Sequence, residues 1–534
     1  MFRTSFFAAA LAASLLPQLL SAQQVQWLTV APNSFNLNPS LPTDVLCARD
    51  PDHVYVAGLD SATILYGNDI LGRNSLSRLN ANGDPVWTVV LNDSVKVESI
   101  TSNAAGTVVI GGRYFGHLVI DGDPTVAVPP FHTGMGSFIC AFDADGLLLW
   151  QHDKSGGQID DVSVASLAFD PQGQLWVALS TFFGSKLVRL NNDGLPVITR
   201  LLLETKTIGN ICFDPSGGMY VSGSASVPSV SINGTTFPVV EQYNFFLARM
   251  NAAGDAQWLH IAHDVTFQRP RVVADGEDHA YLLGSQLDSV SWGNVHFNAP
   301  EWNTSFFLTR LDSSGVFEWG VEPPQAGIIG RFGIGQGMGL GVDDDGNAYV
   351  LGNVSGSVDW GNGMVSNTGG LQTEQVSLLS FDNAGIARSH IEGGSAVSLD
   401  VVHDLAVTHD GICHLVATTG DPFTFGPFTV DPMAVRGSVV ARVDPALGTG
   451  IGLIAEAEAG LVACPSLFST SFHLVSGGAL SDAAVAVRII DASGRTVEEA
   501  AGLGNELGLR LSPGTYTVLV QRGAQVMRTR VVKE

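Results

Sequence analysis

The stretch VDDDGNAYVLGNVSG, residues 342–356, joins an Asp- and Gly-rich turn to a run of β-forming residues. Asp and Asn side chains close turns on their own backbone, and glycine supplies the positive φ that such turns need. The tetrad YVLG that follows (349–352) is rich in residues that favour strands. We therefore interpret the stretch as the turn and second strand of a β-hairpin.

This hairpin recurs along the chain. The other tetrads are YVAG (55–58), VVIG (108–111), WVAL (176–179), YVSG (220–223), YLLG (281–284) and HLVA (414–417). A second element lies between them, in which alternating apolar residues run into Asp or Asn plus Gly and often reach a Trp, as in LSRLNANGDPVW (76–87). Each unit thus holds two hairpins, or four short strands.

Radial closure of such units buries both faces of every sheet and protects the sheet edges. The repeats therefore predict an all-β fold, a seven-bladed β-propeller over residues 40–448. Six or eight blades, or two smaller propellers, stay open as alternatives. The surplus residues fall between the two hairpins of a unit, and we expect them to form outer hairpins or binding loops. They lie at 226–244, 287–303 and 354–372.

The repeat pattern resembles the SBBP-type β-propeller repeats of exported bacterial proteins. The resemblance covers nearly all of the first 450 residues, and its motifs are D-x-D-G-x-x-Y-V-x-G followed by F-L-x-R-L-D-x-x-G and Trp. It implies the fold and says little about the ligand.

The N-terminal residues have the pattern of a targeting signal. Arg3 precedes an apolar stretch that ends in small residues, which predicts a secretory signal peptide over residues 1–22 with cleavage after Ala22. No later segment has the length and hydrophobicity of a transmembrane helix. We expect the mature chain to be exported through the periplasm and the outer membrane, and to be secreted or held at the cell surface.

The C-terminal part differs from the repeats in charge. Residues 449–459 form a small-residue linker, and residues 460–534 hold seven basic and six acidic side chains, whereas the whole chain has a net charge of −25. Short strands with turns at Ser493-Gly494 and Pro513-Gly514 predict a small Ig-like β-sandwich.

This C-terminal part resembles the C-terminal sorting domain of the type IX secretion system of Bacteroidetes. The matching segments are VRIIDASGRTV (487–497), LSPGTYTVLVQRG (511–523) and RVVKE (530–534), while CPSLFS (464–469) departs from the usual proline-asparagine-proline start. The motif residues are Asp491, Gly494, Arg495, Gly514, Tyr516 and Lys533. The resemblance implies that the type IX secretion machinery is a partner and that the cargo is secreted or attached to surface lipopolysaccharide.

The acidity of the repeats would repel nucleic acid and anionic membranes, so we expect neither as a partner. The chain has five cysteines and no CxxC spacing, which gives no support to a zinc site. A disulfide between Cys47 and Cys413, closing the ends of the ring, is a hypothesis.

The sequence predicts no catalytic residue and no required cofactor. Asp343 and Asp345 in the opening stretch are candidate calcium ligands, but an EF-hand register based on Gly346 places glycine at ligand positions 1 and 12. A turn is the favoured interpretation. Outer-loop aromatic residues are candidates for stacking on sugars, although packing is favoured: Trp292, Trp302, Trp360, Phe423 and Phe425.

These observations favour an exported, non-catalytic binding or adhesion scaffold, with glycans or surface lipopolysaccharide as possible ligands. The alternative is a secreted hydrolase or lyase with its site in the central channel, where loops of several blades would bring carboxylates, His or Arg together. Asp160 and Asp161 are weak candidates for a glycosidase acid/base pair, and His260 and His263 are weak candidates for joint metal ligands, because their spacing places the members of each pair on opposite faces of a strand.

Overall fold

The structure is a computed structural model in which all described regular structure is β-strand. It describes residues 23–31, 44–66, 69–115, 118–120, 135–153, 163–181, 184–225, 228–240, 244–263, 270–286, 289–298, 305–323, 330–334, 337–361, 364–370, 373–395, 400–419, 422–431, 437–444, 461–464, 467–468, 470–476, 486–490, 495–501, 507–522 and 525–533. The chain divides into two compact units, residues 1–451 and 452–534.

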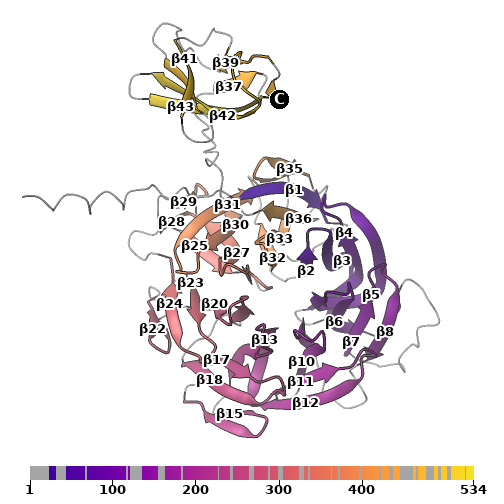
Figure 1. Cartoon of the computed structure of the whole chain (residues 1–534). Helices are drawn as coiled ribbons and strands as arrows, with labels where there is room; N and C mark the ends of the chain where they lie inside the picture. Colours follow the sequence, from indigo (N-terminus) through magenta and orange to yellow (C-terminus); the bar gives the residue numbers. More distant parts are fainter. Residues whose placement is uncertain are drawn as a thin grey trace, which may run out of the picture. The chain divides into compact units, whose positions relative to one another are not determined.

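The first unit is a β-propeller, in which antiparallel sheets follow one another around a central axis (Figure 1). Each group of four strands is a blade, named here after a strand near the axis. The β2 blade holds β2 (Val45–Asp50), β3 (His53–Tyr66), β4 (Asp69–Leu79) and the first half of β5 (Pro85–Ser102). The second half of β5 opens the β6 blade with β6 (Val108–Phe115), β7 (Met135–Phe142) and β8 (Leu148–Asp153).

The next three blades repeat this order from the axis outward. The β9 blade holds β9 (Ser163–Phe169), β10 (Leu175–Thr181), β11 (Gly184–Leu190) and β12 (Pro196–Leu203). The β13 blade holds β13 (Thr205–Phe213), β14 (Met219–Ala225), β17 (Asn244–Met250) and β18 (Ala256–His263). The β19 blade holds β19 (Arg271–Ala274), β20 (Ala280–Gln286), β23 (Ser305–Leu311) and β24 (Phe317–Val321).

Two further blades are formed by described strands of the first unit. In the β26 blade the inner edge is shared by β25 (Arg331–Ile334) and β26 (Leu340–Val342), followed by β27 (Ala348–Ser355), β30 (Glu374–Phe381) and β31 (Ala387–Gly394). The β32 blade holds β32 (Val401–Val407), β33 (Cys413–Thr419), β36 (Gly437–Asp444) and β1 (Gln24–Val30).

Strand β1 closes the ring without a covalent bond. It lies near the N-terminus, yet it pairs with β36 from Gln24 opposite Asp444 to Val30 opposite Val439. The propeller therefore includes a strand ahead of residue 40, where the repeats predict its start. The first and last parts of the propeller sequence share one blade, which keeps the ring from opening.

Tryptophans on the outer strands join blades to their neighbours. In four places among the described residues, the indole N–H donates to a carbonyl in the outer turn of the next blade, between its third and fourth strands. The pairs are Trp27 Nε1 to Ala81 O (2.8 Å), Trp87 Nε1 to Ala144 O (2.9 Å), Trp258 Nε1 to Ser313 O (3.0 Å) and Trp319 Nε1 to Asn383 O (3.0 Å). We call this contact the outer latch.

The outer latch explains why glycine and Trp recur together. Gly146, in the outer turn of the β6 blade, has φ of +84°, and a Cβ there would lie 2.8 Å from Cδ2 of Trp87. Only glycine accepts both the left-handed backbone and the ring at this distance. Arg78 Nη1 also donates to Ala144 O (3.2 Å), so the repeated Arg serves the same contact.

A second set of contacts joins the innermost strands. A polar side chain that follows a β-bulge accepts a hydrogen bond from a backbone N–H of the next blade. The pairs are Ser99 Oγ with Leu167 N (3.0 Å), Ser166 Oγ with Ile211 N (3.2 Å), Asn210 Oδ1 with Val272 N (2.8 Å) and Asp404 Oδ2 with Leu46 N (2.8 Å). We call this contact the inner latch. Asp404 provides it at the seam between the last and first blades.

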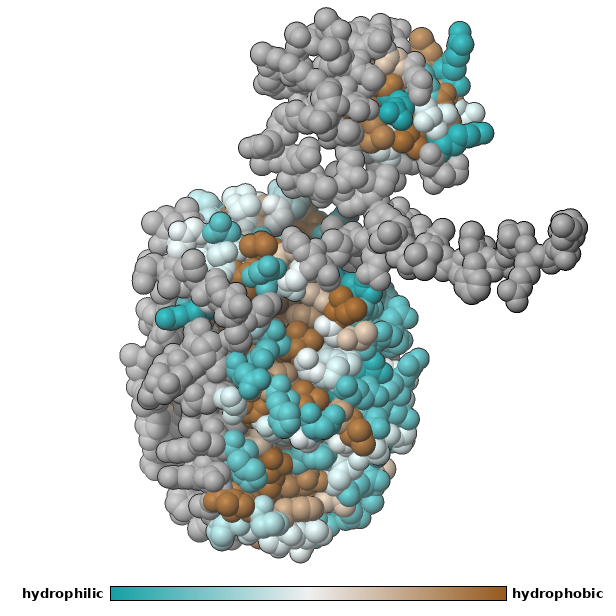
Figure 2. Space-filling model, turned by 90° about the vertical axis from the view of Figure 1, so that its left-hand side faces the viewer, coloured by the Kyte–Doolittle hydropathy of each residue, from teal (hydrophilic) through white to brown (hydrophobic). Residues whose placement is uncertain are grey.

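The surplus residues within the blades form hairpins, as the sequence predicts. We call these hairpins straps. They are β15 (Ser229–Ile232) with β16 (Thr235–Pro238), β21 (Val290–Trp292) with β22 (Val295–Phe297), β28 (Ser357–Gly361) with β29 (Met364–Asn367), and β34 (Phe423–Phe425) with β35 (Phe428–Val430). On the side of the propeller that carries β22 and β24, hydrophobic residues form small patches among hydrophilic ones (Figure 2).

The strap aromatics point into the protein. Trp292, Phe423 and Phe425 are at most 1% exposed and Trp360 is 8% exposed, so these four are packing residues and the sugar-stacking hypothesis is wrong for them. Their burial covers apolar surface on the outer strands. Trp302 lies outside the described residues.

The Cys47–Cys413 disulfide hypothesis is also wrong, because both thiols are free. Cys47 on β2 has its sulfur 3.7 Å from Ser102 Oγ, whereas Cys413 on β33 has its sulfur 3.6 Å from Gly411 O. Burial raises the pKa of Cys47 to about 12, which keeps this thiol protonated.

The second unit contains a five-stranded and a two-stranded sheet. Its strands are β37 (Leu461–Cys464), β38 (Leu467–Phe468), β39 (His473–Ser476), β40 (Ala486–Ile490), β41 (Thr496–Ala501), β42 (Gly514–Arg522) and β43 (Gln525–Lys533). Phe472 and Leu474 pack with Ile489 and Val518 in a common core. The unit is therefore a small β structure with its own hydrophobic core.

Candidate functional site

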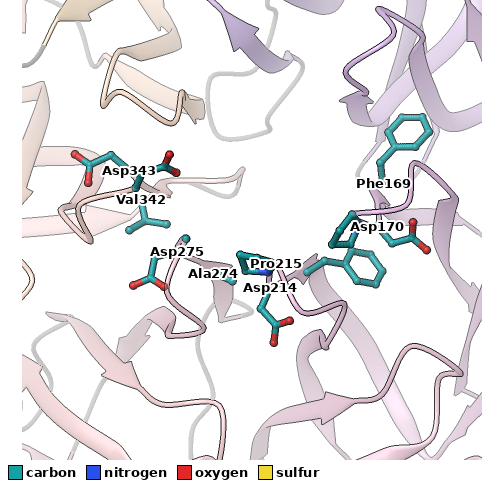
Figure 3. Close-up of a pocket in the computed structure, with 12 residues that line it drawn as sticks. Phe169, Asp170, Asp214, Pro215, Ala274, Asp275, Val342 and Asp343 are labelled. Carbon is teal, nitrogen blue, oxygen red and sulfur yellow. The ribbon is translucent and has the colours of Figure 1, made fainter.

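Four consecutive blades bring equivalent turns together at one end of the central channel. These turns follow β9, β13, β19 and β26 and surround a cavity of about 290 Å³ (Figure 3). Its lining consists of residues 169–171, 213–215, 274–276 and 342–344. We call this cavity the mouth. The mouth is lined by the Asp turns that precede the tetrads of these four blades. The repeat itself therefore brings these turns together.

The aspartate that recurs in these turns does not face the cavity in three of the four blades. Figure 3 shows the carboxylates of Asp170, Asp214 and Asp275 pointing away from the centre of the ring. All three are buried. In each turn, Oδ1 accepts backbone N–H groups from residues two or four positions later. These side chains are therefore used as turn-closing acceptors.

Asp343 shows the arrangement in full. Its Oδ1 accepts from the N–H of Asp345 (3.1 Å) and of Asn347 (2.8 Å), while Oδ2 accepts from Asn347 Nδ2 (2.9 Å) and the Tyr349 hydroxyl (3.0 Å). Burial raises the pKa of Tyr349, so its hydroxyl stays protonated and remains a donor. Both oxygens of Asp343 are engaged within its own hairpin.

Equivalent partners occur in the neighbouring turns. Trp176 Nε1 donates to Asp170 Oδ2 (3.2 Å), as the Tyr349 hydroxyl does to Asp343. The Tyr281 hydroxyl instead donates to Gly346 O of the next blade (2.9 Å) and lies 3.4 Å from Asp275 Oδ2, which is closer to His279 Nδ1 (3.2 Å). The first residue of the tetrad thus donates to the carboxylate of its own turn in the β9 and β26 blades. In the β13 blade, Arg249 takes this place, with Nη2 2.7 Å from Asp214 Oδ2.

The calcium hypothesis names Asp343 and Asp345. The structure places both in one turn, but it buries the Asp343 carboxylate and leaves Asp345 exposed. In the part of the chain that the structure describes, no group of three or more His, Cys, Asp or Glu side chains is arranged to hold a metal ion. Calcium binding by this pair stays a prediction.

The walls of the mouth combine apolar side chains with a larger exposed polar surface. Phe169, Phe213, Ala274 and Val342 are half-buried residues at the ends of the inner strands. Pro171, Pro215 and Gly276 are exposed at its rim. Asp344 is the exposed carboxylate of the lining, and a Cβ on Gly276 would lie 3.6 Å from its Oδ1. The mouth thus combines apolar side chains with exposed polar groups, including the negatively charged Asp344.

A cluster of His403, Asp404 and Asp44 lies at the seam between the β32 and β2 blades. Because His and Asp side chains often act together in catalysis, this cluster is a candidate for the enzymatic alternative. His403 Nδ1 is 3.5 Å from Asp44 Oδ2 and accepts from Asp44 N (3.3 Å), and its Nε2 is 2.8 Å from Thr418 Oγ1. These contacts assign a neutral imidazole with the proton on Nε2. Burial lowers the pKa of His403 to about 4, in agreement with the neutral form.

The carboxylate of Asp404 completes this cluster. It accepts from Leu46 N at Oδ2 (2.8 Å), and from Met338 N (2.8 Å) and Leu405 N (3.2 Å) at Oδ1. Burial raises its pKa to about 7. Asp44, His403 and Asp404 are 1%, 1% and 5% exposed, so a substrate cannot reach them. Their contacts join three blades, which defines a structural role.

The remaining histidine and acid candidates are not brought together. His260 packs against Trp258 and Phe317, with ring centroids 5.1 Å apart in each pair. His263 Nδ1 lies 3.0 Å from Asn244 Oδ1. Asp160 and Asp161 lie outside the described residues.

Two of the residues predicted to form a sorting motif make hydrogen bonds within the second unit. The Tyr516 hydroxyl donates to Ser512 O (2.7 Å), next to Gly514 at the start of β42. Lys533 is 8% exposed, and its Nζ donates to Gly508 O (2.8 Å) and Leu509 O (3.2 Å).

The structure describes one further predicted residue of this motif, Arg495. Arg495 is exposed just ahead of β41. Asp491, Gly494 and the expected cleavage position Ala22 lie outside the described residues.

No family model matches this chain, and no curated protein matches it. Among solved structures, it is similar to the Dos1 propeller, with 9% identity and a TM-score of 0.38 over 79% of this chain and 95% of that one. It is also similar to BBS1N in complex with ARL6DN, with 9% identity and a TM-score of 0.39 over 80% and 98% of the two chains.

A further similar structure is a member of the DUF4221 family from Bacteroides vulgatus, with 6% identity and a TM-score of 0.30 over 80% of this chain and 100% of that one. At these TM-scores and identities, the likenesses carry no argument about ligand, partner or activity. Separately, the described residues include no helix with the length and hydrophobicity needed to cross a membrane.

Proposed function

We propose that this protein is an exported, non-catalytic binding scaffold whose binding site is the mouth of the propeller. The main support for the proposal is that the buried aspartates of the mouth are engaged within their own turns, whereas other lining groups are left to contact a ligand. The buried carboxylates of Asp170, Asp214, Asp275 and Asp343 close their own turns, so the surface left for a ligand consists of apolar side chains together with exposed polar groups, among them the Asp344 carboxylate. Binding sites usually combine apolar side chains with polar groups that orient the ligand.

The lining of the mouth also suggests the chemistry of the ligand. Phe169 and Phe213 contribute apolar atoms to this lining, and Asp344 contributes an exposed negative charge. The chain as a whole carries a net charge of −25, which attracts cations over longer distances. An aromatic or aliphatic group next to a positive charge, as in a peptide side chain or a terminal amine, fits this arrangement best.

The finer architecture is part of the proposal. Seven tetrads and the seven four-stranded groups named above support a seven-bladed propeller. The Tyr516 hydroxyl, bonded to a backbone carbonyl four residues upstream, resembles the tyrosine corner of Ig-like sandwiches and supports an Ig-like fold for residues 460–534. The sequence resemblances support SBBP-type repeats and a type IX sorting domain, with signal cleavage after Ala22.

Binding at the mouth is tested with a matched pair of small probes. We expect tryptamine to bind the full mature chain more tightly than indole-3-propionate, because only tryptamine carries a positive charge. Phe213→Asp will abolish binding of both probes, whereas Asp344→Asn will remove the preference between them. Saturation-transfer NMR measures the binding. Val365→Asp, a change at a 50% exposed site on β29, is the control.

If the Phe213→Asp variant bound both probes as tightly as the wild-type chain does, at an unchanged melting temperature, the binding site would lie elsewhere. Turnover of a glycan or peptide panel by the wild-type chain that is lost in a mouth variant would favour the hydrolase alternative. Absence of turnover together with charge-dependent binding would support the scaffold.

Export is tested in a Bacteroidetes cell with a working type IX system. We expect the mature N-terminus to be Gln23, and we expect the full chain to reach the surface or the medium. A chain ending at residue 451 will remain in the periplasm, since it lacks the sorting unit. Cell fractionation and N-terminal sequencing give the answer. Equal surface delivery of the shortened chain would contradict the sorting role.

A further inference from the structure

A row of three side chains crosses several blades of the propeller. It starts at the first residue of the tetrad on the second strand, continues through an arginine on the third strand and ends at the tryptophan of the fourth strand. The rows are Tyr55–Arg78–Trp87, Tyr220–Arg249–Trp258 and Tyr281–Arg310–Trp319. In each of them the Tyr and Trp ring centroids are 6.0 Å apart. We call this arrangement the aromatic row.

The β32 blade, which contains the closing strand β1, has a histidine where these rows have a tyrosine. His414 on β33 lies opposite Arg442 on β36, and Arg442 lies opposite Trp27 on β1. The ring centroids of His414 and Trp27 are 6.0 Å apart. The aromatic row of this blade therefore places a titratable ring against the tryptophan of the strand that closes the ring.

His414 is buried without a hydrogen-bond partner. The residue is 0% exposed, and neither ring nitrogen has a partner in the protein. Its own turn supplies no carboxylate at the position of Asp343, because Thr408 stands there and its hydroxyl donates to Asp410. An imidazolium needs acceptors or solvent, so this environment favours the neutral ring. Burial lowers the pKa of His414 from 6.5 to about 3, and the Arg442 guanidinium acts in the same direction.

A second buried histidine lies in the same blade. Among the histidines whose side chains the structure describes, His403 and His414 are the two buried ones. His403 belongs to the inner end of the seam, where it contacts Asp44 and Thr418. The blade that is closed by pairing alone thus holds both of these neutral imidazoles, whereas the aromatic rows of three other blades hold tyrosine.

We propose that acid opens the propeller at this blade, because a proton binds His414 and β1 separates from β36. A charged ring inside the aromatic row would be buried beside the Arg442 guanidinium, which is strongly unfavourable. Separation of Trp27 from His414 brings the imidazolium into contact with water, so the open form binds the proton more strongly. The change is reversible, since β1 is held by its pairing with β36 and by the outer latch of Trp27.

The charged groups around His414 come from β36, from the turn between β32 and β33, and from the end of β2. They are the ion pair of Arg442 and Asp444, the carboxylate of Asp410, and Asp50 with its partners Arg49 and His53. Strand β1 contributes none, because QVQWLTV contains no titratable side chain. The proton that enters on opening is therefore assigned to His414 and not to the closing strand.

The inner end of the seam contributes little to the net proton uptake. The pKa of His403 is lowered to about 4 and that of Asp404 is raised to about 7, so their effects offset each other between pH 4 and 6.5. Asp44, Arg271 and Cys47 are the other ionisable groups at this end. Neutral His414 stabilises the closed ring fully above pH 6.5, and this contribution is lost as the pH falls toward 3.

Hydrogen exchange of the full chain, followed by mass spectrometry at several pH values, tests the proposal. Uptake of one proton predicts that the protection factor of the β1 and β36 amides falls by about tenfold for each pH unit below 6.5. The protection factor of the β23–β24 pair should change less. His414→Tyr rebuilds the aromatic row of the other blades and should abolish this pH dependence.

Tyr281→His is the matched control, because it places a histidine in the aromatic row of the β19 blade. It should weaken that blade in acid and leave the pH dependence at β1 as in the wild type. Unchanged pH dependence at β1 in His414→Tyr, at a wild-type melting temperature, would overturn the proposal, as would acid opening that starts at β23–β24 in the wild type. If His414→Tyr does not fold, His414→Gln removes the titrating group and gives the same comparison.

Discussion

Replacing Asp404 by alanine will lower the free energy of unfolding of the propeller by about 3–5 kcal/mol. The carboxylate accepts from Leu46 N, Met338 N and Leu405 N. Its loss removes this acceptor from the buried Leu46 N and the half-buried Met338 N, while Leu405 N also donates to Met338 O (2.7 Å). These donors come from the first blade, the β26 blade and the β32 blade, which makes Asp404 the inner latch of the seam. Equilibrium denaturation with urea measures the change.

The pH dependence of an Asp404→Asn variant separates the two titrating groups at the seam. The pKa of Asp404 rises from 3.8 to about 7 on folding, so its contribution to stability is complete below 3.8 and is lost as pH rises through 7. The pKa of His403 falls from 6.5 to about 4, so its contribution is complete above 6.5 and is lost as pH falls through 4.

Between pH 4 and 6.5 the two effects oppose each other in the wild-type chain. Asp44 and Cys47 on the β2 side, and Arg271 on β19, are the other ionisable groups near the pair. In the Asp404→Asn variant, His403 is the one member of the pair that titrates. The free energy of unfolding should therefore rise more steeply with increasing pH over this range than it does in the wild type. Parallel profiles for the two proteins would contradict the assignment. Asp145→Asn, at an exposed turn, is the control.

Replacing Trp27 by alanine will lower the free energy of unfolding by about 2–4 kcal/mol and will loosen β1. The indole is half-buried, its Nε1 donates to Ala81 O, and its ring lies against Gly83 of the first blade. Because β1 closes the ring without a covalent bond, this outer latch holds the seam. Hydrogen exchange of the β1–β36 pair should accelerate in the variant.

Trp87→Ala is the matched control for Trp27→Ala. Trp87 makes the same contact with Ala144 O, but the two blades that it joins share the continuous strand β5. We expect a similar loss of stability without faster exchange at the seam. Equal exchange at β1 in both variants would show that the closing strand does not depend on its latch.

The repeats made the fold predictable because each hairpin carries its own turn chemistry. The Asp and Gly positions of VDDDGNAYVLG and its relatives fix the turns locally, and the apolar tetrads fix the second strand of each blade. Strand β1 was missed because QVQWLTV stands alone and far from its partner β36. Trp27 was the available signal, since it repeats the Trp of the other outer strands.

The site was less predictable because its chemistry depends on where side chains point. The three carboxylates at 343–345 suggest a ligand site in the sequence, yet the fold turns Asp343 inward onto Asn347 and Tyr349. Asp404 gave no signal, because its position depends on a β-bulge after Val402 and on contacts with two other blades. The mouth arises only when residues from four blades meet.

A crystal structure of the mature chain soaked with tryptamine tests the binding proposal most directly. We predict that the indole ring lies in the mouth between Phe169 and Phe213, with its amine beside the Asp344 carboxylate. Soaking with indole-3-propionate under the same conditions should leave the mouth empty or poorly occupied. Tryptamine bound outside the mouth, or equal occupancy of the mouth by both probes, would contradict the account.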